Sequence, residues 1–117
     1  MGDLYYYLTK KEAPFTEDVI LNILSEIVVS IGFLHEQGIV YRELKPENLL
    51  VNDEGHIKLT DYGLSKVIIE DRKSISTFVG TLEYMAPEAY SGEFGQKADI
   101  WSLGVVMYEL LFKEGLF

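Results

Sequence analysis

The residues best suited to chemistry lie in the segment YRELKPENLL at positions 41–50 and in a DYG tripeptide that follows it. Glu43 can accept a proton from a hydroxyl group, and Lys45 can meet a transferring phosphate as a point charge. Asn48 and Asp61 carry hard oxygen atoms, which suit Mg²⁺ together with phosphate oxygens. The pattern therefore raises one question, which is whether Glu43 is a catalytic base, a displaced base or the remnant of one.

Each of these residues also has an ordinary interpretation. Lys45 and Glu47 are common as solvated loop charges, and Asn48 is a frequent turn former. His35 and His56 are interpreted as surface or helix-end residues, because no partner spacing indicates a metal or a base. Only the combination of these residues favours a catalytic function, and the secondary-structure elements around them decide whether they lie close together.

A long amphipathic helix is predicted before the charged segment, over about 16–37. Thr16 is a typical N-cap residue followed by two acids, Phe15 can pack onto Ile20, and Gly38 supplies a stop. The apolar residues recur at steps of three and four, and the stripe is wide enough that we expect much of this helix to be buried.

Strands and a second helix are predicted after it. The segment 49–60 has two short apolar runs around a turn sequence and is typical of a β-hairpin, and 39–41 is a further short β-prone run. The charged loop precedes the hairpin and DYG follows it, so paired strands present both loops. Residues 64–96 are irregular, and a strongly apolar helix is expected from about Lys97 to Phe112, with Gly104 permitting close packing.

The composition is that of one modest globular domain with no second domain. The chain has 117 residues, 48% hydrophobic and 25% charged, with no cysteine and a formal charge of −9. The acidity argues against nonspecific nucleic-acid binding and favours basic peptides or metal-bound anions as partners. No run of 18 apolar residues occurs, so we expect no membrane segment. The absence of cysteine fits an intracellular, cytoplasmic protein.

Five segments in order resemble a eukaryotic-type protein kinase. YRELKPENLL resembles the catalytic loop, DYGLSK the metal-binding DFG segment, and GTLEYMAPE the end of the activation segment. ADIWSLGVVMYELL resembles the helix beneath the catalytic loop, and MGDLYYYL the residues that leave the hinge between the lobes. The details favour the serine/threonine kinases of the AGC type.

The resemblance implies an α+β, mainly α, fold. This is part of a kinase large lobe, with a long helix, catalytic loop, β-hairpin, activation segment and second long helix. The small lobe and the last large-lobe helices would be absent, so residues 1–117 are expected to form a partial kinase domain. Such a fragment would be inactive by itself and could associate through exposed apolar surface.

The resemblance also implies catalytic roles. Glu43 matches the aspartate that accepts the substrate hydroxyl proton, and Lys45 the lysine that contacts the γ-phosphate of ATP. Thr81 matches the threonine that hydrogen-bonds between them. Asn48 and Asp61 match the two ligands of Mg²⁺, so the expected cofactors are ATP and Mg²⁺.

Nucleotide and substrate contacts follow in the same way. Asp3 matches an acid that touches ribose and, with Glu47, binds an arginine of a basic Ser/Thr substrate. Leu4 and Leu49 match the lower wall of the nucleotide pocket, with Val106 and Leu110 supporting it, and plain core packing is the alternative for all four.

Activation and anchoring residues complete the resemblance. Thr77 matches an activation-loop phosphorylation site, whose phosphate would pair with Arg42 and Lys66. An unmodified loop is the alternative at Thr77. Asp99 matches the buried acid that fixes the catalytic-loop backbone, and Glu88 a buried acid that pairs with an arginine.

One departure bears on the chemistry. Glu43 stands where the family has aspartate, and one methylene moves the carboxylate by roughly 1.5 Å. Displacements of about 1 Å can lower a rate on the order of a hundredfold, so we expect an impaired base. Two alternatives remain open: a pseudokinase kept for docking or regulation, and a small α/β binding module unrelated to phosphoryl transfer.

Overall fold

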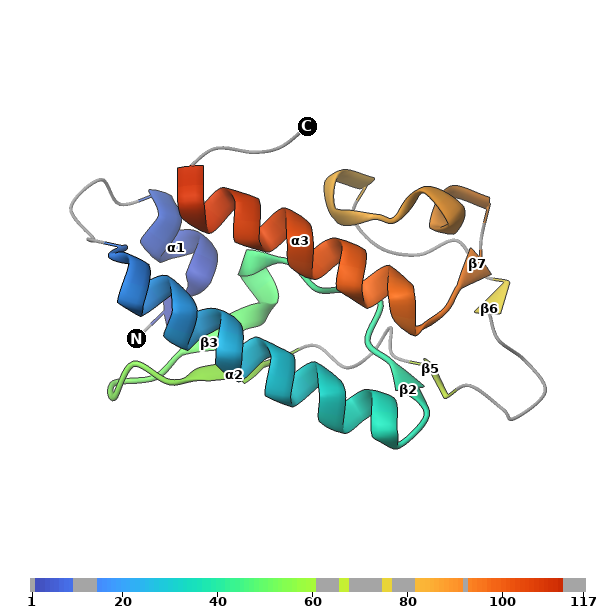
Figure 1. Cartoon of the computed structure of the whole chain (residues 1–117), viewed down its shortest axis with the longest axis horizontal. Coiled ribbons are helices and arrows are strands. Elements are labelled where there is room, and N and C mark those ends of the chain that lie inside the picture. The colour runs from blue at the N-terminus through green and yellow to red at the C-terminus, as the bar shows by residue number, and fades with distance from the viewer. Residues whose placement is uncertain are drawn as a thin grey trace.

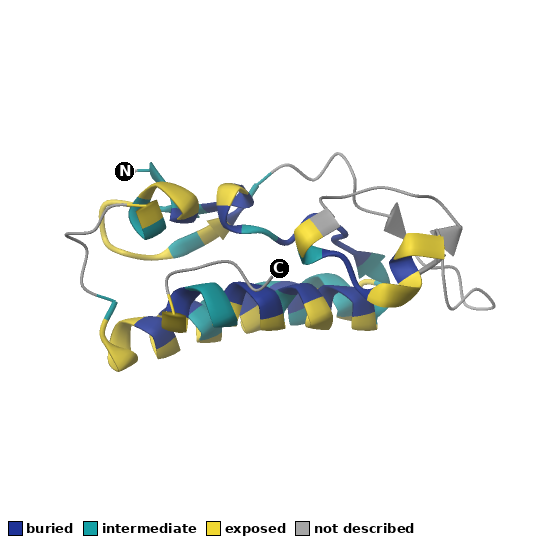
Figure 2. Cartoon of the chain, turned by 90° about the horizontal axis from the view of Figure 1, so that it is seen from above, coloured by how far each residue is buried: buried dark blue, intermediate teal, exposed yellow. Residues whose placement is uncertain are grey.

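The computed structural model describes residues 2–9, 15–60, 66–67, 75–76, 82–91 and 93–112. Two long helices, α2 (Glu17–Glu36) and α3 (Gln96–Phe112), lie side by side and contact each other (Figure 1). Seen from above, these helices form one layer (Figure 2). The short helix α1 (Leu4–Thr9) and a β-hairpin lie against one face of this helical layer and form a second layer. Two packed layers are usual for a small domain.

Helix α2 confirms the predicted amphipathic helix. The hydroxyl of Thr16 accepts a hydrogen bond from the backbone N–H of Val19 at 3.3 Å, and Gly38 follows the helix with φ of 74°. The expectation that much of its surface is buried is wrong, because burial follows one stripe, while Val29 is 72% and Phe33 62% exposed. The buried stripe consists of Ile20, Ile23, Ile27 and Ile31.

Among the described residues, α2 is the one helix long and apolar enough to cross a membrane by length and composition. This is weak evidence, because a core helix of a soluble protein passes the same test. The buried stripe of α2 packs into the main core of this chain, and 22% of the apolar window is buried.

Helix α3 confirms the second predicted helix. Val106 and Leu110 are 0% and 1% exposed, so these two residues pack into the core. Gly104 does not serve close packing as expected, because it is exposed and a Cβ added there would meet no atom within 4 Å.

The small sheet confirms the predicted hairpin. Strand β3 (Leu49–Val51) pairs antiparallel with β4 (Ile57–Leu59), and β1 (Gly2–Asp3) pairs with the other edge of β3. Asn52 closes the turn, since its Oδ1 accepts hydrogen bonds from the backbone N–H groups of both Glu54 and His56.

Within the described ranges, four further strands form two short antiparallel pairs, and three 3₁₀ helices occur in the loops. The strands are β2 (Ile39–Val40) with β5 (Lys66–Val67), and β6 (Ile75–Ser76) with β7 (Glu93–Phe94). The 3₁₀ helices are Pro46–Asn48, Leu82–Tyr84 and Pro87–Ser91. The structure is thus mainly helical with a small sheet, as predicted from the sequence.

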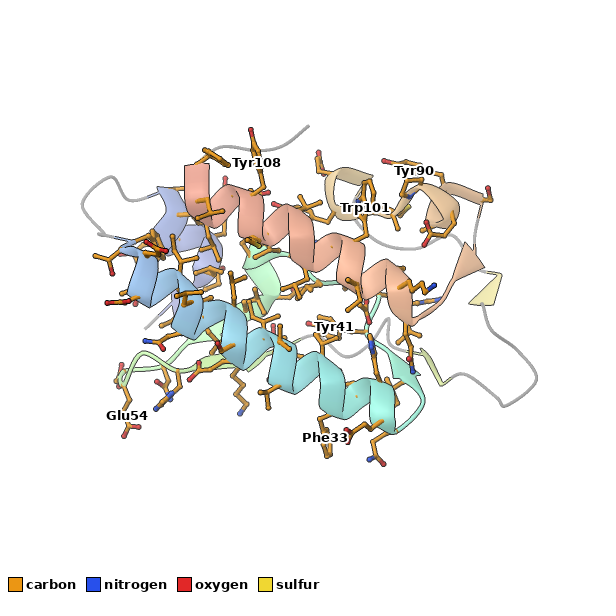
Figure 3. The ribbon with its side chains drawn as sticks, viewed as in Figure 1. Phe33, Tyr41, Glu54, Tyr90, Trp101 and Tyr108 are labelled. Carbon is orange, nitrogen blue, oxygen red and sulfur yellow. The ribbon has the colours of Figure 1, made fainter. Side chains whose placement is uncertain are left out.

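The main core joins α1, both long helices, the charged loop and the hairpin. Two of its members, Tyr41 and Leu44, belong to the charged loop itself and are 0% and 1% exposed. Figure 3 shows the Tyr41 side chain between the two long helices in projection. The loop is therefore built into the core at these positions, which leaves its polar residues in defined places.

Candidate active site

The charged loop begins on a buried carboxylate. Asp99, in the first turn of α3, is 1% exposed and accepts the backbone N–H of Tyr41 at 2.8 Å and that of Arg42 at 2.9 Å. Arg42 has φ of 71°, a left-handed conformation that costs about 1–2 kcal/mol for a residue with a Cβ. Hydrogen bonds to a charged acceptor contribute about 1.5–3 kcal/mol each, so Asp99 offsets this strain.

His35 supports the same carboxylate from the end of α2. Its Nε2 lies 2.8 Å from Asp99 Oδ2, and its own carbonyl accepts a hydrogen bond from Gln96 Nε2 at 2.8 Å. His35 was expected to be a surface or helix-end residue; it lies in the last turn of α2, which confirms the helix end, and only 13% of its side chain is exposed. Three donors thus converge on Asp99, two from the loop and one from α2.

The candidate base and the candidate phosphate ligand lie together on this loop. Glu43 Oε1 is 3.2 Å from Lys45 Nζ, and their side chains are 8% and 20% exposed. The ammonium group of Lys45 therefore lies beside the carboxylate that would accept a proton. Pro46 opens the 3₁₀ helix that follows and fixes the backbone directly after Lys45.

Asn48 is held at the other end of the loop. Its side-chain Nδ2 donates to the carbonyl of Glu43 at 2.8 Å, and its own carbonyl accepts the backbone N–H of Thr60 at 2.9 Å. The hydroxyl of Thr60 donates to the same carbonyl at 3.1 Å. Because the amide nitrogen is committed, the amide oxygen is the atom that suits a cation, and it fits the oxygen preference of Mg²⁺.

Several predicted site residues lie outside the described part of the chain, so their positions are not compared. They are Asp61, Thr77 and Thr81. Lys66 lies in β5, opposite Val40 of β2, and its side chain is likewise outside the description. Within the described ranges, no group of three or more His, Cys, Asp or Glu side chains could hold a metal ion.

Arg42, the expected phosphate partner, is a buried residue at 6% exposure. Burial lowers the pKa of its guanidinium, while the carboxylates of Asp99 and Glu43 act to raise it. The guanidinium keeps its positive charge at neutral pH, because an arginine titrates far above that range.

The expected nucleotide-wall residues are core residues. Leu4 and Leu49 are both 0% exposed and belong to the main core, and their contact with a nucleotide stays a prediction. Leu50, the next residue of β3, is partly exposed, because successive side chains of a strand point to opposite faces. Asp3 pairs in register with Leu50, and its carboxylate accepts the backbone N–H of Tyr6 at 2.7 Å, which caps α1.

An acidic group around Tyr84 was missed by the sequence interpretation. Burial raises the pKa of the Tyr84 hydroxyl, as do its hydrogen bond to Glu109 and the charges of Glu109, Glu47 and Glu83. Burial also raises the pKa of Glu109, although the hydrogen bond from Tyr84 acts to lower it. The sequence feature that could have predicted this group is Glu109, a single acid inside the apolar run IWSLGVVMYELL.

Glu88 does not have the burial that was expected of it. Its side chain is exposed in the 3₁₀ helix Pro87–Ser91, whereas Ala89 beside it is fully buried. An exposed carboxylate remains hydrated, so in this chain it carries none of the desolvation cost of a buried acid.

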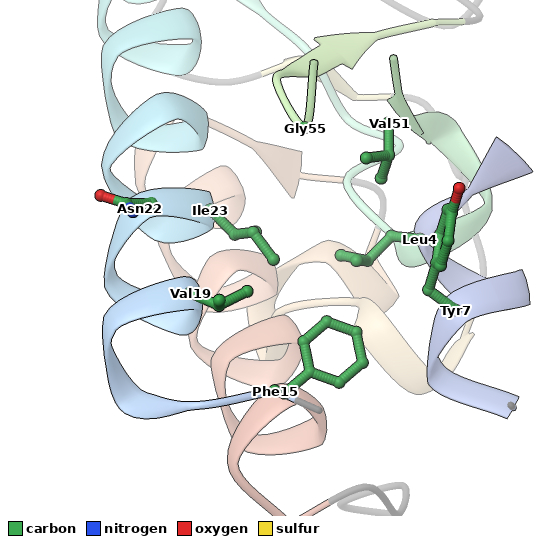
Figure 4. A pocket seen from close by; sticks show the side chains of 8 residues that line it. All are labelled: Leu4, Tyr7, Phe15, Val19, Asn22, Ile23, Val51 and Gly55. Carbon is green, nitrogen blue, oxygen red and sulfur yellow. The ribbon is translucent and has the colours of Figure 1, made fainter. Parts of the chain in front are cut away.

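A separate cavity of about 290 Å³ lies between α1, the start of α2 and the hairpin (Figure 4). Figure 4 shows the Asn22 amide pointing away from it, so the interior is largely hydrocarbon. Leu4 is the one candidate site residue among the residues that line this cavity. Its lining residues are Leu4, Tyr7, Phe15, Val19, Asn22, Ile23, Val51 and Gly55.

Comparison with known proteins identifies close relatives over nearly the whole chain. Residues 1–117 match the family model described as the protein kinase domain. Ribosomal protein S6 kinase alpha-3 of Mus musculus and of Homo sapiens are each 50% identical to it over 111 residues. A putative ribosomal protein S6 kinase alpha-1 of Caenorhabditis elegans has the same identity over the same length. These matches cover 94% of this chain but 14–15% of the relatives.

Proposed function

This chain belongs to the protein kinase family, in its serine/threonine branch, and from that premise we propose that it forms part of the catalytic large lobe of a kinase. The whole protein would transfer the γ-phosphoryl group of ATP to a Ser or Thr hydroxyl of a protein substrate. The observation that supports this most directly is the Glu43–Lys45 pair at 3.2 Å, on a loop whose backbone is fixed by Asp99.

The chain's own residues divide the chemical work. Glu43 would take the proton of the attacking hydroxyl, and Lys45 would attract the γ-phosphate. Asn48 and Asp61 would hold Mg²⁺, which neutralises phosphate charge when bound. Thr81, between base and lysine in the family pattern, would hold their orientation.

The acidic group supports a proposal for the substrate class. Glu47, Glu83 and Glu109 all act on Tyr84 with negative charge. An arginine or lysine near the target Ser or Thr would be attracted to such a group, with Asp3 as a further acid at the nucleotide side. A basic peptide context is therefore proposed for the substrate, and the net charge of −9 agrees with it.

Regulation and context are proposed from the family pattern. Phosphorylation of Thr77 would add negative charge that Arg42 and Lys66 can pair with. The 117 residues contain no Gly-rich loop and no matching β3 lysine, so we propose that they do not transfer phosphate without further kinase segments. We propose a partial domain spanning 1–117 in an intracellular, cytoplasmic kinase, with Leu4 and Leu49 near the nucleotide, as the family pattern implies.

Glu43 also favours a second candidate function. If its extra methylene disables the base, the lobe would serve docking or regulation as a pseudokinase. Family membership removes the alternative of a binding module unrelated to kinases.

A chimera tests these proposals. Residues 1–117 replace the matching segment within the kinase domain of ribosomal protein S6 kinase alpha-3, and transfer from radiolabelled ATP to a basic Ser peptide is measured. We expect detectable transfer and a gain on the order of 10- to 100-fold for Glu43→Asp. Lys45→Ala should abolish the gain, whereas Lys58→Ala, at an exposed lysine of β4, is the matched control.

The three outcomes separate the candidates. Transfer by the unmodified chimera supports a working kinase. Transfer by the Glu43→Asp chimera alone supports the pseudokinase. A folded chimera that transfers nothing with either residue at position 43 would refute the catalytic assignment.

A further inference from the structure

Glu26 bridges α2 and the hairpin with both of its carboxylate oxygens. Its Oε1 lies 2.5 Å from His56 Nδ1, and its Oε2 accepts the backbone N–H of Ile57 at 2.6 Å. The carboxylate is one-third exposed, and it reaches across 30 residues of sequence to the first residues of β4. A backbone N–H bound to a carboxylate is a charge-assisted hydrogen bond, which is stronger than a neutral one.

A short path connects this bridge to the charged loop. Strand β4 runs from Ile57 to Leu59, and the next residue, Thr60, donates its backbone N–H and its hydroxyl to the carbonyl of Asn48. The strand is paired with β3 at each of its three residues, so its backbone position is tied to that of β3. Fixing Ile57 against α2 therefore also limits where the Asn48 carbonyl can lie.

The charged groups that act on His56 come from two elements. The hydrogen bond to Glu26 of α2 raises the pKa of His56, and the charges of Glu26 and Glu54 raise it further. Glu54 belongs to the hairpin turn, with its Oε2 at 3.9 Å from His56 Nε2. Burial acts to raise the pKa of Glu26, but the hydrogen bonds from His56 and Ile57 outweigh it, so that pKa is lowered.

These shifts define the pH range of the bridge. A raised histidine pKa means that its stabilisation is complete below the unfolded value of about 6.5 and is lost as pH rises through the folded pKa. A lowered glutamate pKa means that its stabilisation is present above about 4.5 and is lost as pH falls further. Both partners are charged between these limits.

We propose that Glu26 is a positioning residue for the phosphoryl-transfer loop: its carboxylate fixes the start of β4, and through β4 the Asn48 carbonyl, more firmly when His56 is protonated. This inference rests on the proposed function for its biological meaning. The contacts that carry it belong to the folded chain alone, so it can be tested without nucleotide.

The test is an NMR titration of the ¹⁵N-labelled chain from pH 5 to pH 9. We expect the amide signals of Ile57, Thr60 and Asn48 to shift with the same midpoint as the His56 ring. Glu26→Gln keeps the size of the side chain and should lower that midpoint. At pH 6 it should also speed hydrogen exchange at Ile57 and Thr60 by about tenfold, the difference between a charged and a neutral hydrogen bond.

Glu54→Gln is the matched control, because it removes a carboxylate from the other nitrogen of the same ring. It should leave hydrogen exchange at Thr60 within about twofold of the starting chain. Unchanged amide signals of Tyr41 and Arg42 show that both variants remain folded around Asp99.

Two results would overturn the proposal. One is a His56 titration that moves Ile57 while Thr60 and Asn48 stay still, which means that the bridge acts locally. The other is an equal effect of Glu26→Gln and Glu54→Gln. Either result leaves the phosphotransfer measurement with the chimera untouched, so the two proposals fail separately.

Discussion

Replacing Asp99 by asparagine measures how far the charged loop depends on one buried carboxylate. Asparagine keeps the shape but turns one acceptor into an amide N–H₂ group. That group would face a backbone N–H of Tyr41 or Arg42, so one hydrogen bond is lost and the other loses its charge. Bonds to charged groups contribute about 1.5–3 kcal/mol each, so we expect a loss of about 3 kcal/mol in the free energy of unfolding.

This loss is large against the total stability of a small domain, which is about 5–15 kcal/mol. It should lower the midpoint of thermal unfolding by roughly 10–15 °C, as measured by circular dichroism. The ¹⁵N signal of Arg42 should shift as well, because its left-handed backbone loses the bond that offsets its strain. His35→Phe, which keeps a ring but removes one donor from the same carboxylate, should cost only about 1 kcal/mol.

The control is Glu88→Gln, since that carboxylate is exposed and should change stability by no more than about 0.5 kcal/mol. The reasoning is refuted by a loss below about 1 kcal/mol for Asp99→Asn. It is equally refuted by an unchanged Arg42 signal, because the loop backbone would then be held by something other than Asp99.

Two further predictions concern the surface of α2. Val19→Phe should fill the apolar cavity and raise the free energy of unfolding, measured by urea denaturation, by about 0.5–2 kcal/mol. Equal effects of Val19→Phe and of the control Val29→Phe would contradict this prediction. Val29, 72% exposed on the same helix, makes the matched substitution away from the cavity. Exposed apolar side chains should also make the chain self-associate, so Phe33→Glu should lower the mass measured by light scattering at high concentration, whereas Lys58→Glu, on the hairpin, should not.

The long helices and the hairpin could be predicted because their signals are local. Residues three and four apart lie on one face of a helix, and the turn sequence around Asn52 sets the hairpin. The extent of burial on α2 could not be predicted, because periodicity marks an apolar face without showing what covers it. Val19 and Val28 fall on the predicted apolar stripe and are 39% and 52% exposed in the structure.

The contacts that complete the site join residues far apart in the sequence. His35 meets Asp99 across 64 positions, and Glu26 meets His56 across 30. No spacing rule relates such pairs, since their distance depends on how α2 packs against α3 and the hairpin. Both histidines were therefore interpreted as surface or helix-end residues, and tertiary packing supplied a carboxylate partner in each case.

Because both ends of the charged loop are fixed, the backbone cannot compensate for the extra methylene of Glu43. A loop that could slide would absorb an additional methylene by shifting its backbone. Here Asp99 holds the backbone at Tyr41 and Arg42, and Thr60 holds the carbonyl of Asn48 at the other end. The side chain of Asn48 also donates to the carbonyl of residue 43 itself.

Contacts on both sides therefore fix the backbone at position 43. The extra methylene of Glu43 must then displace its carboxylate group. Lys45 adds to this, since its ammonium group lies 3.2 Å from Glu43 Oε1 and draws the carboxylate toward itself. A shorter aspartate on the same backbone would be withdrawn by roughly 1.5 Å. The gain expected for Glu43→Asp thus arises from geometry alone, because the charge and the scaffold stay the same.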